Sequence, residues 1–177
     1  MPRIENIRLT RVAIPLRQPF VTAAGKKTET HNIQVAVQLS DGTLGVAEAS
    51  SSIAMPGETP AHMESALKQL APEIREKDIR DYRSLIQDCW RLQPYHPTAV
   101  AALECALLDA YTRTQGQALY QFLGGSKISI ESDLTLSIGT PAHLTKVTRA
   151  AVKKGFRKFR LELYGQRVVY KRLVILT

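Results

Sequence analysis

The chain has no long apolar run, and this absence is the first constraint on its function. None of its 177 residues belongs to an uncharged apolar stretch of about 18 residues, so we expect no membrane-spanning helix. The N-terminal residues Met1 to Glu5 also lack the apolar core that a secretory signal needs. We therefore expect a cytoplasmic protein with no membrane partner.

Cysteine is scarce, and histidine shows no pattern that would hold a metal. The two cysteines, Cys89 and Cys105, fall in segments with helical spacing and apolar neighbours. Small buried hydrophobic residues are the simpler interpretation of both, ahead of a redox or metal-binding role. The four histidines are too scattered to form a metal motif, so we expect no metal ligand among His31, His62, His96 and His143.

Acidic residues are nearly missing from the last part of the chain. Residues 146–177 contain ten basic residues and one acidic residue, whereas residues 1–145 contain fourteen basic and fifteen acidic residues. The net charge of +8 is therefore a property of the tail and not of the body. A nucleic-acid-binding module usually shows a basic stripe interleaved with stacking aromatics, which this chain lacks, so we expect no nucleic-acid partner.

Alternating residues and turn signals predict a three-stranded antiparallel sheet near the N-terminus. Gly42 in the turn can supply the positive φ of a tight hairpin, and Pro15 is expected to end the first strand. The polar segments 17–30 and 50–60 are predicted to be two loops, and long loops on compact domains often carry function. The strands are predicted over residues 3–14, 33–39 and 44–49.

The apolar spacing then changes to the helical period. Thr59 can cap a helix that has Pro60 at its first position, and two further helices are predicted before Gly116. Residues 133–163 show a strand, a helix and a strand, which form a βαβ unit and imply a parallel sheet. An antiparallel sheet with helices, followed by a βαβ unit, indicates two domains.

Short motifs throughout this region resemble the mandelate racemase and muconate lactonizing branch of the enolase superfamily. Each motif is weak alone, but their shared order and spacing over residues 3–163 are specific, and dipeptide (L-Ala-D/L-Glu type) epimerases are the most similar group. The motifs are the start of a first flexible loop at residues 15–20, a "DGxxGxGE"-like hairpin at 40–49, the second loop at 56–59, the helical stretch 99–125, and the barrel-strand residues 137–139 and 155–156.

The resemblance implies the fold and the division of the chain. We expect an α+β capping domain over residues 1–125, in which a three-stranded antiparallel sheet is followed by helices. Residues 126–177 would be the start of a (β/α)₈ (TIM) barrel, carrying the atypical basic tail. A complete barrel takes roughly 200 residues or more, so this chain would hold an incomplete (β/α) barrel segment.

The resemblance also implies a type of chemistry. Enzymes of this family are isomerases that remove a proton next to a carboxylate, while Mg²⁺ held by three carboxylates stabilises the enediolate and lysines transfer the proton. The three metal carboxylates belong to the third, fourth and fifth barrel strands, so none can be assigned here. We expect Mg²⁺ to be the cofactor of the family and expect none to be bound by this chain.

Two candidate catalytic positions follow from the second barrel strand, which in this family ends in a Lys-x-Lys pair. The matching residues are Arg160 and Glu162, and both depart from the pattern. Arg160 can hold a carboxylate but stays protonated. Glu162 reverses the charge at the position of a basic amine, and it is either a weak substitute base or a strand-end residue with no catalytic duty.

Four further positions resemble substrate-contacting residues of dipeptide epimerases: Phe20, Thr22, Ile53 and Thr135. Thr135 is either a pocket residue or simply a β-branched residue suited to a strand. Ala24 stands where relatives that act on glutamate use a cation, which disfavours an acidic dipeptide.

These expectations leave several functions open. The first is a truncated dipeptide epimerase, inactive as this chain alone, whose family substrate is a small dipeptide or another carboxylate. Muconate cycloisomerase and o-succinylbenzoate synthase ancestries are alternatives, and a non-catalytic interaction or oligomerisation module is another. Open strand edges would favour a homo-oligomer.

Overall fold

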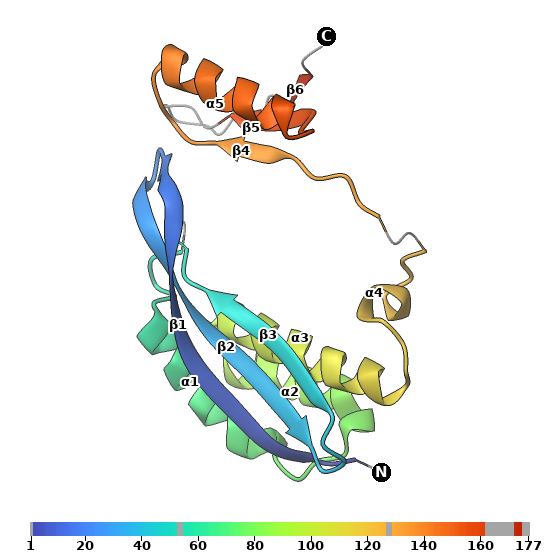
Figure 1. The fold of residues 1–177 in the computed structure, drawn as a ribbon. Helices are drawn as coiled ribbons and strands as arrows, with labels where there is room; N and C mark the ends of the chain where they lie inside the picture. The colour runs from blue at the N-terminus through green and yellow to red at the C-terminus, as the bar shows by residue number, and fades with distance from the viewer. Residues whose placement is uncertain (1, 53–54, 127–128, 162–171, 175–177) are drawn as a thin grey trace. The chain divides into compact units, whose positions relative to one another are not determined.

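A computed structural model describes residues 2–52, 55–126, 129–161 and 172–174 of the chain. The chain divides into two units, which are described separately here (Figure 1). We call residues 1–14 and 30–126 the capping unit. We call residues 15–29 and 127–177 the βαβ unit.

A three-stranded antiparallel sheet begins the chain, as predicted. The strands lie in the order β1-β2-β3, and Figure 1 shows that each runs opposite to its neighbour. The β2–β3 turn is tight because Gly42 has a φ of 85°, and its N–H donates to the Leu39 carbonyl at 2.9 Å. The strand bounds are β1 Ile4–Thr22, β2 Gly25–Leu39 and β3 Leu44–Ser50.

The first predicted loop was wrong, because β1 and β2 continue through it as one long hairpin. β1 does not end at Pro15 but reaches Thr22, and β2 already begins at Gly25. β1 is an edge strand, where a proline can lack its N–H without breaking a ladder between two neighbours. The polar composition of segment 17–30 reflects exposure of this hairpin end and not a loop conformation.

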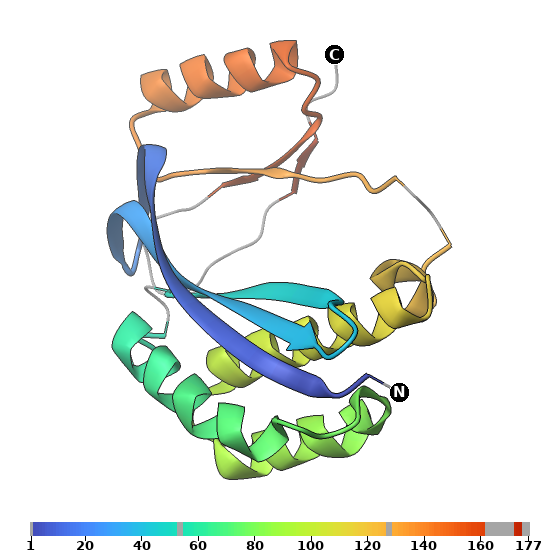
Figure 2. The same ribbon diagram turned by 60° about the horizontal axis from the view of Figure 1, so that its bottom comes forward.

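Three longer helices and two short ones follow, and α1, α2 and α3 cover one face of the sheet (Figure 2). The cap predicted for α1 is confirmed, since Thr59 Oγ1 accepts a hydrogen bond from the His62 N–H at 3.2 Å. The core between sheet and helices holds fully buried Ile33, Leu67 and Leu103. The bounds are α1 Pro60–Ile74, the 3₁₀ helix η1 Ile79–Asp81, α2 Tyr82–Leu92, α3 Pro97–Thr114 and α4 Leu119–Phe122.

β3 and α3 pack closely against each other in the capping unit. A Cβ atom placed on Gly45 would lie 2.2 Å from the Ala106 carbonyl oxygen and 2.7 Å from the Ala110 Cβ. Asp109 on α3 adds a hydrogen bond between the two elements, since its Oδ2 accepts from the Val46 N–H at 2.9 Å. The small residues of α3 therefore serve to bring a helix backbone close to a strand.

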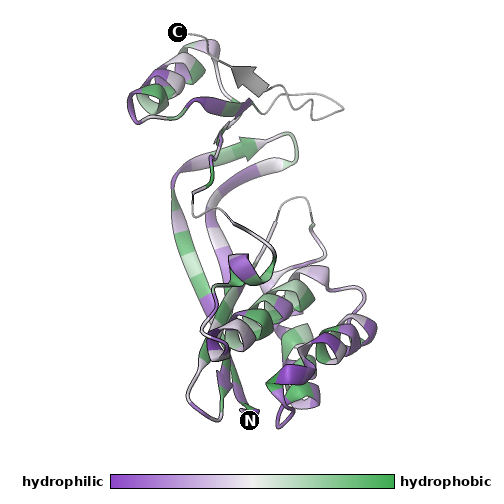
Figure 3. Cartoon of the chain, turned by 90° about the vertical axis from the view of Figure 1, so that its right-hand side faces the viewer, coloured by the Kyte–Doolittle hydropathy of each residue, from purple (hydrophilic) through white to green (hydrophobic). Residues whose placement is uncertain are grey.

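The βαβ unit has its own small core. β4 (Leu134–Leu136) and β5 (Lys158–Leu161) pair in parallel, and α5 (Pro141–Lys153) connects them. Leu136, Ala151 and Phe159 are buried in this core. By contrast, the long β1–β2 hairpin shows hydrophobic and hydrophilic bands along its strands (Figure 3), as is common in an antiparallel sheet with one exposed face.

A third strand, β6 (Arg172–Val174), pairs antiparallel with β5. All strands of a (β/α)₈ barrel are parallel, so β6 does not take the direction of a third barrel strand. Across the parts of the chain that the structure describes, no helix has the length and apolarity needed to cross a membrane.

The Gly45 contact leads to a stability prediction. Gly45→Ala should lower the free energy of unfolding of the capping unit by about 2 to 3 kcal/mol, because the new methyl group overlaps backbone atoms of α3 that cannot move aside. Urea unfolding followed by circular dichroism measures this. Gly57→Ala is the matched control, since a Cβ there meets no atom within 4 Å, and it should be close to neutral. Equal effects of the two substitutions would contradict the packing described here.

Candidate functional site

The described part of the βαβ unit contains four of the six residues that the sequence suggested for a site. Phe20 and Thr22 lie at the end of β1, Thr135 lies on β4, and Arg160 lies on β5. The other two, Ile53 and Glu162, lie outside the described residues. Residues about 115 to 140 positions apart in the sequence therefore belong to one compact unit.

A backbone hydrogen bond joins the end of β1 to the segment that follows β4. The Ile138 N–H donates to the Val21 carbonyl at 3.0 Å. Phe20 and Thr22 are the immediate neighbours of Val21, and both are partly buried. This contact holds the hairpin end beside the C-terminal end of β4, which is the end where parallel strands of α/β proteins carry their functional residues.

Thr135 and Arg160 lie opposite each other in the β4–β5 ladder. Their neighbours Leu136 and Phe159 are buried in the core beneath α5. Because side chains alternate along a strand, Thr135 and Arg160 occupy the other face of the two-stranded sheet. Thr135 is partly buried and Arg160 is exposed, so both side chains are placed away from the packing core.

Asp133 also belongs to this face, although the sequence analysis did not single it out. Its Oδ2 lies 3.5 Å from Arg160 Nη2. Asp133 stands two residues before Thr135, so the period-two alternation of the strand was the signal that could have identified it. A second ion pair, between Lys158 and Glu131, lies alongside. Exposed pairs of this kind contribute only about 0 to 1 kcal/mol, so a substrate carboxylate can compete for the Arg160 guanidinium.

The described residues do not fit a Mg²⁺ site. No group of three or more His, Cys, Asp or Glu side chains that could hold a metal ion occurs within them. Two described carboxylates of the βαβ unit, Glu131 and Asp133, are each paired with a basic side chain. Mg²⁺ requires several oxygen ligands in near-octahedral geometry, and this face does not provide them.

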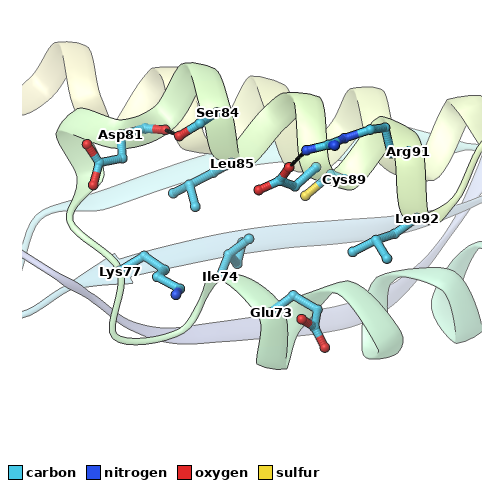
Figure 4. Close-up of a pocket in the computed structure, with 10 residues that line it drawn as sticks. Glu73, Ile74, Lys77, Asp81, Ser84, Leu85, Cys89, Arg91 and Leu92 are labelled. Carbon is cyan, nitrogen blue, oxygen red and sulfur yellow. Dashed lines mark hydrogen bonds and ion pairs between the residues drawn. The ribbon is translucent and has the colours of Figure 1, made fainter.

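The capping unit has a separate surface groove of about 550 Å³ between α1, η1 and α2 (Figure 4). Its charged residues do not converge on one point, and Asp88 is paired with Arg91. Burial raises the pKa of the Cys89 thiol to about 11, with the Asp88 charge adding to the effect. That thiol stays protonated at neutral pH, so the groove offers no activated nucleophile.

The sheet, its covering helices and the attached βαβ unit define the class of protein. This is the arrangement of an enolase-superfamily capping domain joined to a partial barrel. Residues 4–124 match the mandelate racemase/muconate lactonizing enzyme, N-terminal domain, and the chain belongs to this family.

The similar proteins include several dipeptide epimerases. An aromatic dipeptide epimerase from Herpetosiphon aurantiacus is 32% identical over 167 residues, covering 94% of this chain and 47% of the relative. An L-Ala-D/L-Glu epimerase from Bacillus subtilis is 29% identical over 162 residues, covering 91% of this chain and 44% of the relative. The chain therefore spans about half the length of the curated relatives it matches.

Solved structures give the same result. A mandelate racemase/muconate lactonizing protein from Herpetosiphon aurantiacus has a TM-score of 0.88 at 32% identity, over 95% of this chain and 47% of that one. A dipeptide epimerase from Methylococcus capsulatus, complexed with Mg and the dipeptide L-Arg-D-Lys, has a TM-score of 0.86 at 28% identity, over 93% of this chain and 47% of that one.

The placement of Thr135 gives a second prediction. Thr135→Val should change the unfolding free energy by less than about 0.5 kcal/mol, because the residue lies off the core face and valine keeps the strand preference. Phe159→Ala, on the next strand but buried beneath α5, should cost about 3 kcal/mol. Hydrogen exchange of the α5 amides reports both effects. Strong destabilisation by Thr135→Val would mean that the Thr135 hydroxyl makes a structural hydrogen bond, and it would contradict this placement.

The two cysteines give a third prediction. Cys89 is buried, whereas Cys105 is exposed, contrary to the expectation that both are buried. A thiol reagent at about pH 8 should label one thiol per native chain, and the second only after unfolding. Labelling should be slower than for a free cysteine, because burial and then the Glu104 charge raise the pKa of the Cys105 thiol. Substituting Cys105→Ser should abolish native labelling, and labelling that persists would contradict this assignment.

Proposed function

We propose that the chain provides the capping unit and the first barrel strands of a Mg²⁺-dependent dipeptide epimerase. The observation that carries this proposal is the βαβ unit, in which Phe20 and Thr22 lie at one strand end while Thr135 and Arg160 share one face. Membership of the family and the similarity to epimerases with dipeptide substrates support it.

In this proposal, the residues of the chain select and orient the dipeptide. Phe20 and Thr22 at the hairpin end contact its side chains, together with Ile53 from the second loop and Thr135 from β4. Arg160 holds a carboxylate by paired hydrogen bonds, for which its planar guanidinium is suited. The uncharged Ala24 at the hairpin tip favours a dipeptide without an acidic side chain, and the relative that acts on aromatic dipeptides supports this.

The proposal also holds that these 177 residues do not catalyse the reaction by themselves. Proton removal next to a carboxylate needs a positive centre where the anion develops, and Mg²⁺ supplies it in this family. The described residues do not fit such a site. Glu162 places a further negative charge at the position of the catalytic lysine, where it opposes formation of the enediolate.

A second candidate is a non-catalytic module that keeps the family fold and binds another protein or a second copy of itself. The antiparallel pairing of β6 with β5 favours it, because this strand leaves the parallel order of a barrel. The two candidates differ in what happens when the missing barrel strands are restored. Only the epimerase proposal predicts that activity returns.

Restoring the barrel tests the proposal. Residues 1–163 of this chain would be joined to the C-terminal half of the Herpetosiphon aurantiacus aromatic dipeptide epimerase, with the same half alone as the blank. Exchange of the Cα proton of an aromatic L,L-dipeptide in D₂O, with and without Mg²⁺, is followed by NMR. We expect weak, Mg²⁺-dependent exchange of the Cα proton. A folded chimera that shows no exchange, even with Glu162→Lys, would contradict the proposal.

A fourth prediction concerns position 162 in that chimera. Glu162→Lys should raise kcat by roughly 10²- to 10⁴-fold, because it replaces an opposing charge by a general base. The control is Glu73→Lys, which makes the same charge change at an exposed position of α1 in the capping unit and should leave kcat within a factor of about two. Similar gains from both variants would point to net charge and not to a base at position 162.

A further inference from the structure

The end of the second loop is held against α3 by a buried carboxylate. Glu58 is only 5% exposed, although it lies in a loop segment. Its Oε2 accepts a hydrogen bond from the Thr98 N–H at 2.7 Å. An acidic residue is rarely buried this completely without a structural or functional partner, and forty sequence positions separate Glu58 from Thr98.

The start of α3 needs such a partner. The N-cap residue His96 makes no side-chain hydrogen bond to the helix, and Pro97 at the first position has no N–H. Thr98 therefore supplies the first N–H that points out of the helix end, and Glu58 accepts it. The negative charge is also favourable there, because the dipole of this 18-residue helix is positive at its N-terminus.

The second oxygen of Glu58 faces His96. Glu58 Oε1 and His96 Nδ1 lie 3.6 Å apart, which is beyond hydrogen-bonding distance. Both atoms are buried, and neither has a hydrogen-bond partner within the described part of the chain. Because an unpaired buried polar atom is costly, a small shift that lets His96 donate to Glu58 would satisfy both atoms at once.

The same loop segment is held from the other side by α1. His62 Nδ1 lies 2.8 Å from the Gly57 carbonyl, which can only accept, so this ring nitrogen donates. Thr59 caps α1, and the Glu58 N–H donates to the Met55 carbonyl at 3.0 Å. Residues 55–59 are therefore fixed between the starts of two helices. Two contacts link them to Thr98 of α3: the short hydrogen bond to Glu58, and a longer one in which the Thr98 hydroxyl donates to the Met55 sulfur at 4.0 Å.

We infer that Glu58 is a positioning residue that fastens the segment Met55–Thr59 to the N-terminus of α3. Without it, the segment would keep its attachment to α1 and only the long Thr98–Met55 sulfur contact with α3. That this segment helps to select a dipeptide rests on the proposed function. The attachment itself does not, since it depends only on contacts within the capping unit.

Amide hydrogen exchange of the full chain, measured residue by residue by NMR, tests this inference. In Glu58→Ala, the amides of Thr98 and of the non-proline residues in segment 55–59 should exchange roughly tenfold faster or more, because a charge-assisted hydrogen bond is lost. The amides of Val35 and Val37, in the centre of the sheet, should not change. Glu58→Gln should restore most of the protection, because its side-chain oxygen can still accept from Thr98.

The matched control is Glu64→Ala on α1. Glu64 also pairs with basic side chains, Arg11 at 2.5 Å and Lys68 at 2.6 Å, and neither of these partners lies on α3. Its removal should leave the exchange of residues 55–59 unchanged. If Glu58→Ala accelerates exchange over the whole sheet, the Glu58→Gln variant is the deciding measurement. Restored protection of Thr98 and residues 55–59 in Glu58→Gln supports the positioning role of Glu58, and a lack of such protection overturns it. Unchanged exchange in Glu58→Ala also overturns it.

The outcome of the hydrogen-exchange experiment is independent of the outcome of the chimera experiment that tests the proposed function. Suppose that the amides exchange faster in Glu58→Ala and the chimera has no activity. The positioning role of Glu58 would then be supported, and the epimerase proposal would be contradicted. In an active chimera, Glu58→Ala should raise KM for the dipeptide several-fold and change kcat less, because the loop binds and does not react. A fall in kcat with unchanged KM would contradict a positioning role.

Discussion

The close approach of α3 to β3 at Gly45 is the contact on which the capping unit depends. The helix backbone lies where any side chain at position 45 would have to be, so helix and strand keep one relative placement. Asp109 strengthens it, because one oxygen accepts the Val46 N–H and also pairs with Arg113 Nε at 3.0 Å. The Val46 N–H on the edge strand β3 therefore donates its hydrogen bond to a helix side chain and not to another strand.

The same helix links the packing to the candidate function. Its middle is fixed against the sheet, and its N-terminus receives the carboxylate of Glu58 from the second loop. A ligand-binding loop that is already held by a rigid element loses less conformational entropy when the ligand binds. If the proposed function holds, the small residues of α3 contribute to it indirectly, because they determine where the helix end lies.

The sequence predicted much of this structure, for physical reasons that can be stated. The Gly42 turn, the Thr59 cap and the helical spacing of α1 and α3 are local signals, and the structure has each of them. The long β1–β2 hairpin was missed because its composition resembles a loop. A polar segment with Pro15 near its start can remain a strand when it lies at a sheet edge and is exposed.

The candidate site was only partly predictable. Phe20, Thr22, Thr135 and Arg160 came from family motifs, but their common unit follows from the Val21–Ile138 hydrogen bond and the β4–β5 register, which no local pattern encodes. The ion pair of Asp133 with Arg160 required alternation on one strand to be combined with pairing across two. The Glu58 anchor joins a loop to a helix over a distance that periodicity cannot reach.

The central claim, which rests on the proposed function, is that the described residues include substrate-selecting elements and do not form a metal site. Calorimetric titration of the 177-residue chain with Mg²⁺ tests it most directly. The account predicts no saturable heat, because the carboxylates of the βαβ face are paired with Lys158 and Arg160 and do not converge. Saturable binding of one Mg²⁺ per chain, lost when Asp133 and Glu131 are replaced by alanine, would contradict it.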